Sequence, residues 1–219
     1  MFITFEGLDF SGKSTQATLL VDALNRTSRS ASPPASHVHF IREPGGTPIS
    51  ERVRTILLDR QALEMAEATE LFLFAASRAQ LVRQLIMPAL TLGTVVVCDR
   101  FADSTTAYQG YGRGIELETV ERINNLATGG LRPDLTLLID IPLEEMDLRA
   151  RAAGTVEDRM ERSGRAFYAR VRNGYLTMAA AEPGRFRVID GTMPVARVHD
   201  EVRAAVGAAL ATTIPSGLP

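Results

Sequence analysis

The sequence predicts an α/β fold in three layers, with a five-stranded parallel sheet between two layers of helices. Short apolar runs that suit buried strands alternate along the chain with longer stretches of helical periodicity. The 219 residues show no internal repeat and suffice for one domain with a substantial core. We therefore expect a single domain over residues 1–210, followed by a flexible tail over 211–219.

The first half of the chain supplies two of the strands. The run at 2–5 is apolar and ends at a glycine, which predicts a buried strand, and apolar residues recur at helical spacing over 13–25. Residues 27–36 are rich in Ser and contain two prolines, so we expect a polar surface loop there. The run at 38–41 is the second predicted strand.

The second half completes the sheet. A long helix is predicted over 66–90, and apolar runs at 95–98, 135–139 and 186–189 predict the remaining strands. Because strands alternate with helices, the sheet should be parallel and should bind its ligands at the carboxyl ends of the strands.

Composition argues against several classes of partner. The formal net charge of −2 gives no basic field for nucleic acid or a membrane surface, and no apolar run approaches the roughly 20 residues of a membrane helix. The single cysteine, Cys98, lies in an apolar run and is interpreted as a core residue rather than a nucleophile. One cysteine, and a strand that begins almost at Met1 without a signal peptide, predict a cytoplasmic protein.

A glycine-rich motif follows the first strand and opens the first helix. It matches G-x-x-x-x-G-K-[ST] and consists of Gly7, Leu8, Asp9, Phe10, Ser11, Gly12, Lys13 and Ser14. Its backbone amides and the helix dipole should surround the β-phosphate of a nucleoside triphosphate. Lys13 should neutralise the β- and γ-phosphates, and the Ser14 hydroxyl should ligate Mg²⁺.

Lys13 is also the only lysine among 24 basic residues, the others being arginine. The guanine-recognition motif of common GTPases needs a second lysine, and partition-type ATPases need an additional one in the loop. Both classes are therefore excluded, which favours a kinase of small molecules over a nucleotide-driven switch.

Several further segments match one family in order. They are FEGLD at 5–9, REPGGT at 42–47, FAASR at 74–78, DRF at 99–101, AYQG at 107–110, RPDL at 132–135 and DRME at 158–161. On these segments the chain resembles bacterial thymidylate kinases. The resemblance implies a P-loop kinase with a short lid at about 149–165, ATP-dependent phosphorylation of dTMP to dTDP, Mg²⁺ as cofactor and a homodimer.

The resemblance also implies roles for individual residues. The ATP site would comprise the glycine loop, Thr15, and Asp190 and Thr192 of a loop beside adenine. Ser14 and Asp99 would hold Mg²⁺, with Asp99 acting directly or through water. The residues implied for dTMP are Asp9, Arg42, Phe74, Arg78, Arg100, Ser104, Thr105, Tyr108 and Gln109. The catalytic set would be Lys13, Arg100, Asp9, Arg151 and Arg159.

Purely structural roles for these residues are also compatible with the sequence. Asp9 could cap its loop, Phe74 could be a core residue like its neighbours Leu71 and Phe72, and Tyr108 could support a loop. Likewise, the aspartate and arginine that end the third strand could form a structural ion pair, and the lid arginines could be a solvated basic face.

The chain departs from the family at two positions. Where members carry an arginine, either in the glycine loop or just before the lid glycine, this chain has Phe10 and Ala153. Arg151 and Arg159 are therefore the candidates for the lid arginine. Two alternatives to a dTMP kinase remain: a kinase of another pyrimidine nucleotide or nucleoside, and a nucleotide-binding module with impaired catalysis.

Overall fold

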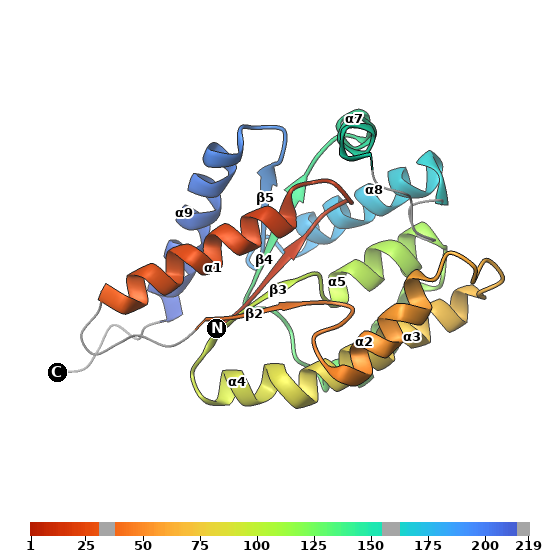
Figure 1. Ribbon diagram of the computed structural model, residues 1–219, viewed down its shortest axis with the longest axis horizontal. Helices are drawn as coiled ribbons and strands as arrows, with labels where there is room; N and C mark the ends of the chain where they lie inside the picture. The colour runs from red at the N-terminus through yellow and green to blue at the C-terminus, as the bar shows by residue number, and fades with distance from the viewer. Residues whose placement is uncertain (31–37, 155–162, 214–219) are drawn as a thin grey trace.

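The computed structural model describes residues 1–30, 38–154 and 163–213 and contains the expected parallel sheet (Figure 1). The five strands are all parallel and lie in the order β2-β3-β1-β4-β5. Their bounds are β1 Phe2–Glu6, β2 Val38–Arg42, β3 Val95–Asp99, β4 Leu135–Asp140 and β5 Phe186–Asp190. All five strands were predicted, each with an end within one residue of that observed.

Helices cover both faces of the sheet, so the predicted three-layer architecture is confirmed. The elements are α1 Lys13–Ser30, α2 Pro48–Leu58, α3 Glu67–Leu81, the π-helical turn η1 Val82–Ile86, α4 Met87–Thr91, α5 Ala102–Thr105, the π-helical segment η2 Thr106–Gly112, α6 Leu117–Thr128, α7 Leu143–Ala153, α8 Arg165–Ala181 and α9 Val195–Thr213. Helices α1 and α9 lie on one side of the sheet, and α3, α4, α5 and α8 lie on the other (Figure 1).

Alternation along the strands assigns side chains to the two faces. In β1, Ile3 and Phe5 pack with α1 and α9, whereas Phe2 packs with α3 and α4 on the opposite face. Cys98 belongs to this second cluster and is fully buried, and burial raises the pKa of its thiol well above the ordinary value. Its interpretation as a core residue is confirmed.

Three expectations about the helices need correction. Helix α1 continues to Ser30, so the loop predicted at 27–36 is wrong for 27–30; no proline interrupts the helix before Pro33. The predicted helix 66–90 is interrupted by η1, just before Pro88, which cannot donate to the preceding turn. Helix α9 extends past 210 to Thr213. The rest of the predicted loop and tail lies outside the described residues.

The topology brings two functional segments together. Strands β1 and β3 are neighbours, with Phe5 opposite Asp99, so the glycine loop and the Asp99–Arg100 pair leave the same edge of the sheet. Within the described ranges, no helix has the length and apolarity that crossing a membrane requires.

Candidate active site

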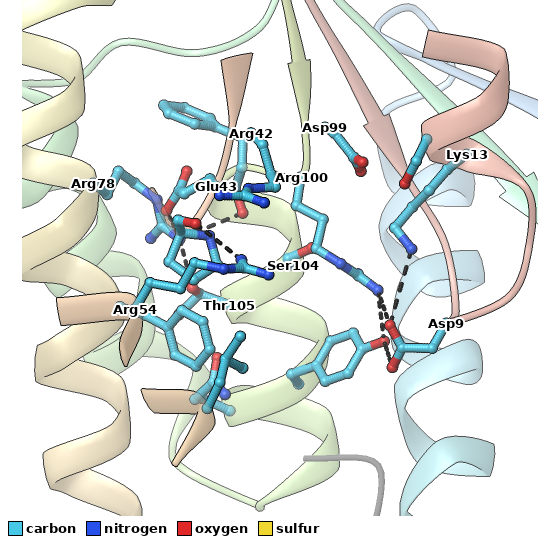
Figure 2. Close-up of a pocket in the computed structure, with 17 residues that line it drawn as sticks. Asp9, Lys13, Arg42, Glu43, Arg54, Arg78, Asp99, Arg100, Ser104 and Thr105 are labelled. Atoms are coloured by element: carbon cyan, nitrogen blue, oxygen red, sulfur yellow. Dashed lines mark hydrogen bonds and ion pairs between the residues drawn. The ribbon is translucent and has the colours of Figure 1, made fainter. Parts of the chain in front are cut away.

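A cavity of about 290 Å³ opens at the carboxyl ends of β1, β2 and β3 (Figure 2). It is lined by Asp9, Lys13, Ser14, Arg42, Glu43, Pro44, Arg54, Leu58, Phe74, Arg78, Asp99, Arg100, Phe101, Ser104, Thr105, Tyr108 and Gln109. Every residue that the sequence implied for dTMP is in this set. The glycine loop contributes to one end of the cavity and α3 to the other.

The glycine loop has the tight conformation that its sequence demands. Gly7 has φ 139°, and a Cβ there would overlap the carbonyl oxygen of Ile139 in the neighbouring strand. Phe10 adopts φ 61°, which is uncommon for a residue other than glycine. Its ring packs against the core cluster that contains Met146 and Tyr168, and this contact holds the strained position.

Lys13 extends from the start of α1 into the loop. Its Nζ donates to the carbonyl oxygen of Leu8 at 3.2 Å and lies 3.9 Å from the Asp9 carboxylate. Burial, followed by the charge of Arg100, lowers the pKa of Lys13, although Asp9 opposes that shift. The ammonium is therefore desolvated and close to a second cation, an arrangement that an anionic ligand would stabilise.

Arg100 is the centre of the polar network in the cavity. It adopts φ 69°, and its Nη2 donates to Asp9 at 2.6 Å and to the Tyr108 hydroxyl at 3.1 Å, as Figure 2 shows in part. Its Nη1 donates to Ser104 and to the Gly7 carbonyl. The structural ion pair considered from the sequence therefore exists, but its carboxylate is Asp9 rather than Asp99.

Asp9 is held between cations and hydroxyl groups. Burial raises the pKa of its carboxyl, but Arg100 and Lys13 more than offset this, so the pKa lies below its ordinary value. Tyr108 and Tyr168 each donate to its Oδ2 at 3.2 Å. The carboxylate thus links the glycine loop to Arg100, a function beyond capping its own loop.

Glu6 lies beneath this network and was missed from the sequence, where it appeared only as the last residue before the loop. Its carboxylate accepts from the Phe101 amide at 2.7 Å, from Ser104 and from the Tyr175 hydroxyl at 2.8 Å. Both of these hydroxyls also contact Arg100. Burial, followed by the charge of Asp103, raises the pKa of Glu6 to about 7.

The raised pKa of Glu6 predicts a pH-dependent stability. An acid that binds its proton more tightly in the folded state stabilises the protein below pH 4.5, and this contribution is lost as the pH rises towards 7. The wild type should therefore lose free energy of unfolding between pH 4.5 and 7 that Glu6→Gln, which has no titrating group there, does not lose. The difference between the two should shift in favour of the variant by up to about 3 kcal/mol over this range. Urea unfolding followed by circular dichroism at several pH values measures the difference.

Glu182 offers a matched control for that experiment. Its hydrogen bond from Arg185 lowers the pKa of its carboxyl below 4.5, so Glu182→Gln should show a constant difference from wild type above pH 5. If plots of the free energy of unfolding against pH run parallel for Glu6→Gln and the wild type from pH 5 to 7, Glu6 does not titrate in this range and the raised pKa is refuted.

The far end of the cavity is built on α3. Phe74 is half-buried and lines the cavity, while Arg78, one turn along the same helix, is almost fully buried. Arg78 Nη2 lies 2.6 Å from the Glu43 carboxylate and donates to Thr105 at 2.7 Å. Phe72, grouped with the core from the sequence, is 59% exposed, so that expectation is wrong.

Asn124 is a second residue that sequence analysis missed at this end. Its Oδ1 accepts from Arg78 Nη1 at 2.6 Å, and its Nδ2 donates to the Ala102 carbonyl and to Thr106. Arg42, by contrast, lies at the rim, exposed and paired with Glu51. The cavity therefore has a rigid buried end and an exposed charged margin.

The residues that the sequence implied for magnesium are oxygen donors near the glycine loop. Asp99 is 6% exposed, and its Oδ1 is a buried atom with no hydrogen-bond partner among the described residues. Ser14 is exposed in the first turn of α1 and lines the same cavity. An unpaired carboxylate oxygen that shares a cavity with a hydroxyl suits Mg²⁺, which prefers oxygen ligands and retains several waters.

Arg149 connects the two loops expected around ATP, a role that its sequence position did not reveal. From α7 it donates to the carbonyls of Phe10 and Ser11 at 3.3 Å each, and to Gly191 at 2.8 Å. Glu145, one turn earlier, orients the guanidinium at 2.7 Å.

The other residues expected for ATP and the lid are less constrained. Asp190 and Thr192 are exposed and bond to each other, and Thr15 is exposed on α1. Arg151 lines a second cavity with Asp9 and Phe10. Arg159 and most of the second half of the predicted lid lie outside the described residues.

Comparisons with known proteins identify the family to which the chain belongs. The family model described as thymidylate kinase matches residues 5–202. The chain belongs to the thymidylate kinase family. The thymidylate kinase of Trichlorobacter lovleyi is 44% identical, with 98% of this chain and all of the relative covered; that of Kosmotoga olearia is 47% identical, with 92% and 93% covered.

A solved thymidylate kinase has the same fold. The crystal structure of the enzyme from Ehrlichia chaffeensis superposes with a TM-score of 0.74 at 36% identity, covering 94% of this chain and 98% of the other. As a thymidylate kinase, the chain phosphorylates dTMP to dTDP with ATP as donor. These matches support dTMP phosphorylation over the alternatives left open by the sequence.

Proposed function

We propose that dTMP binds in the cavity with its base between α3 and η2 and its phosphate beside Arg100, facing ATP on the glycine loop. The observation that carries this assignment is the cavity itself. Phe74 and Arg78 line one end, Lys13 lines the other, and Arg100 lies in the same space. A pyrimidine nucleotide has this order of groups, an apolar ring with polar edges at one end and an anion at the other.

Catalysis in this arrangement is positioning and charge neutralisation. The acceptor is already an anionic phosphate, so little base catalysis is needed. The Lys13 ammonium stabilises charge on the phosphates of the donor, and the Arg100 fork holds the oxygens of the acceptor. Arg100 exchanges its contact with Asp9 for the substrate phosphate, and Asp9 retains Lys13 and two tyrosines as partners.

Ser14 and Asp99 would hold the magnesium ion that accompanies ATP, with water between Asp99 and the metal. When bound, Mg²⁺ supplies positive charge to the donor phosphates. The support for this pair is the unpartnered buried oxygen of Asp99 in the same cavity as Ser14. Thr15, Asp190 and Thr192 complete the proposed ATP site, in which Arg149 braces the glycine loop against the Asp190 loop.

A lid arginine completes the clamp on the transferring group. Arg151 and Arg159 are the candidates, and Arg151 has support from its position in a cavity shared with the glycine loop. Closure of this segment would exclude water from the reacting groups. A single domain that includes α9 to Thr213, and a lid at about 149–165, belong to the same interpretation.

The test is ADP release, measured by a coupled assay with dTMP, dUMP, UMP, CMP and thymidine in turn. We expect dTMP to give the highest kcat/KM, because in this placement Tyr108 would crowd a ribose 2′-hydroxyl and Phe74 would stack on the base. Higher kcat/KM for a ribonucleotide or for thymidine would contradict the placement of the substrate. Binding of ATP without dTDP formation would indicate a binding module.

A homodimer is part of the proposal, supported by exposed apolar side chains on neighbouring helices. Ile56 of α2, Phe72 of α3 and Leu126 of α6 are 51%, 59% and 86% exposed. Such side chains suit burial against a second copy of the chain. Sedimentation equilibrium should give twice the 23.8 kDa chain mass, and Phe72→Asp should shift it towards the monomer. We also propose a cytoplasmic location, in keeping with a single buried cysteine.

A further inference from the structure

Glu70 lies behind the cavity and contacts one of the residues that line it. It is on α3, is 1% exposed, and its Oε1 accepts a hydrogen bond of 2.8 Å from Nε2 of Gln109. Gln109 belongs to η2 and lines the cavity, whereas Glu70 does not. Glu70 engages one of the two N–H groups of the Gln109 amide, which leaves the amide oxygen available to accept from a ligand.

The side-chain amide of Gln109 cannot rotate by half a turn, exchanging its oxygen and nitrogen, while Glu70 is ionised. Arg113 donates to Glu70 from Nε at 3.3 Å and from Nη2 at 3.2 Å, and its guanidinium also lies over the Phe167 ring. A carboxylate paired with arginine only accepts hydrogen bonds. A flipped Gln109 would place its oxygen against this carboxylate and leave two buried acceptors facing each other, which is unfavourable.

Thr105 shows a comparable constraint beside Gln109. Its Oγ1 accepts from Arg78 Nη2 at 2.7 Å, so its hydroxyl hydrogen is directed elsewhere and can donate. The cavity thus offers a fixed acceptor, the Gln109 oxygen, and a nearby donor. Thymine and uracil present a donor at N3 beside the O4 acceptor, whereas cytosine presents an acceptor at N3 beside the N4 donor.

We infer that Glu70 is a positioning residue that determines base specificity: it orients the Gln109 amide so that the cavity accepts a thymine or uracil edge and rejects a cytosine edge. This inference rests on the proposed placement of the base beside Gln109. Glu70 acts through Gln109 and does not touch the substrate. Discrimination arises because a wrong base leaves buried polar groups unpaired.

The sharpest test compares dUMP with dCMP, which differ only at this edge of the base and not in a methyl group. In Glu70→Gln, the new amide can donate to the Gln109 oxygen, which frees the Gln109 nitrogen to face the base. The ratio of kcat/KM for dUMP to that for dCMP should fall tenfold or more from its wild-type value. A thermal melt confirms that the variant is folded.

Two control variants separate the possible outcomes. Arg113→Lys keeps a cation beside Glu70 without touching Gln109, so the ratio should stay within about twofold of wild type. Gln109→Met removes the amide and should lower the ratio. If folded Glu70→Gln retains the wild-type ratio while Gln109→Met lowers it, the role of Glu70 is refuted and the dTMP site stands.

The proposed site itself fails if Gln109→Met also leaves the ratio unchanged, because the base then does not lie beside Gln109. Should Glu70→Gln fail to fold, Glu70→Asp provides the same test. It retains a charge for Arg113 but withdraws the oxygen from Gln109 by one methylene, and the dUMP to dCMP ratio should again fall. An unchanged ratio in Glu70→Asp would refute the inference.

Discussion

Replacing Lys13 with methionine should lower kcat for dTMP phosphorylation by roughly 10³-fold or more. The chain has no second lysine, and the Lys13 ammonium is the cation that emerges from the glycine loop itself. Methionine fills a similar volume, so the melting temperature should change little. Steady-state kinetics with saturating ATP and dTMP, alongside a thermal melt, measures both effects.

Lys13→Arg is the matched control, because it keeps the charge but replaces a compact ammonium with a planar fork. The loop backbone closes around Lys13, with Nζ 3.2 Å from the Leu8 carbonyl, so a guanidinium should fit poorly and activity should remain low. Near-normal turnover by Lys13→Met would refute the assignment of the glycine loop as the donor-phosphate site.

Arg100→Met should reduce kcat/KM for dTMP by about 10³-fold while changing the KM for ATP much less. Arg100 holds Asp9, Tyr108 and Ser104 in the resting protein and supplies the two-pronged donor for the acceptor phosphate. Its removal takes away both the charge and the geometry. Varying each substrate in turn separates the effect on dTMP from that on ATP.

Arg42→Met is the comparison variant, since Arg42 lies at the rim of the same cavity with a half-exposed side chain. Its loss should cost about tenfold or less, because solvent screens a charge at that position. Equal losses from the two variants would mean that Arg100 has no special relation to the acceptor phosphate.

The parts of the fold that the sequence predicted are those fixed by local patterns. Short apolar runs predicted all five strands. The inner strands β1, β3 and β4 are buried along nearly their whole length and must therefore be apolar, whereas the edge strands β2 and β5 are largely exposed and were found from runs of similar length. The glycine loop was recognised from residues that only one tight turn requires, and Gly7 meets that requirement against Ile139. Arg100 followed from a family motif at the end of β3, and Tyr108 from a second motif that lies in η2.

The missed residues act through contacts between distant parts of the chain. Glu6 bonds to Tyr175, which is 169 residues away, and Arg78 bonds to Asn124, which is 46 residues away. No local pattern carries such pairs. The sequence around Phe72 is apolar on every side of α3, so periodicity could not show which ring faces solvent.

The most direct test of the proposed site is a crystal structure of the protein soaked with dTMP. The arrangement predicts a pyrimidine ring stacked on Phe74, with N3 within hydrogen-bond distance of the Gln109 oxygen and the phosphate on the Arg100 guanidinium. A nucleotide bound elsewhere, or bound in this cavity with its phosphate on Arg78 and its base towards Lys13, would contradict it.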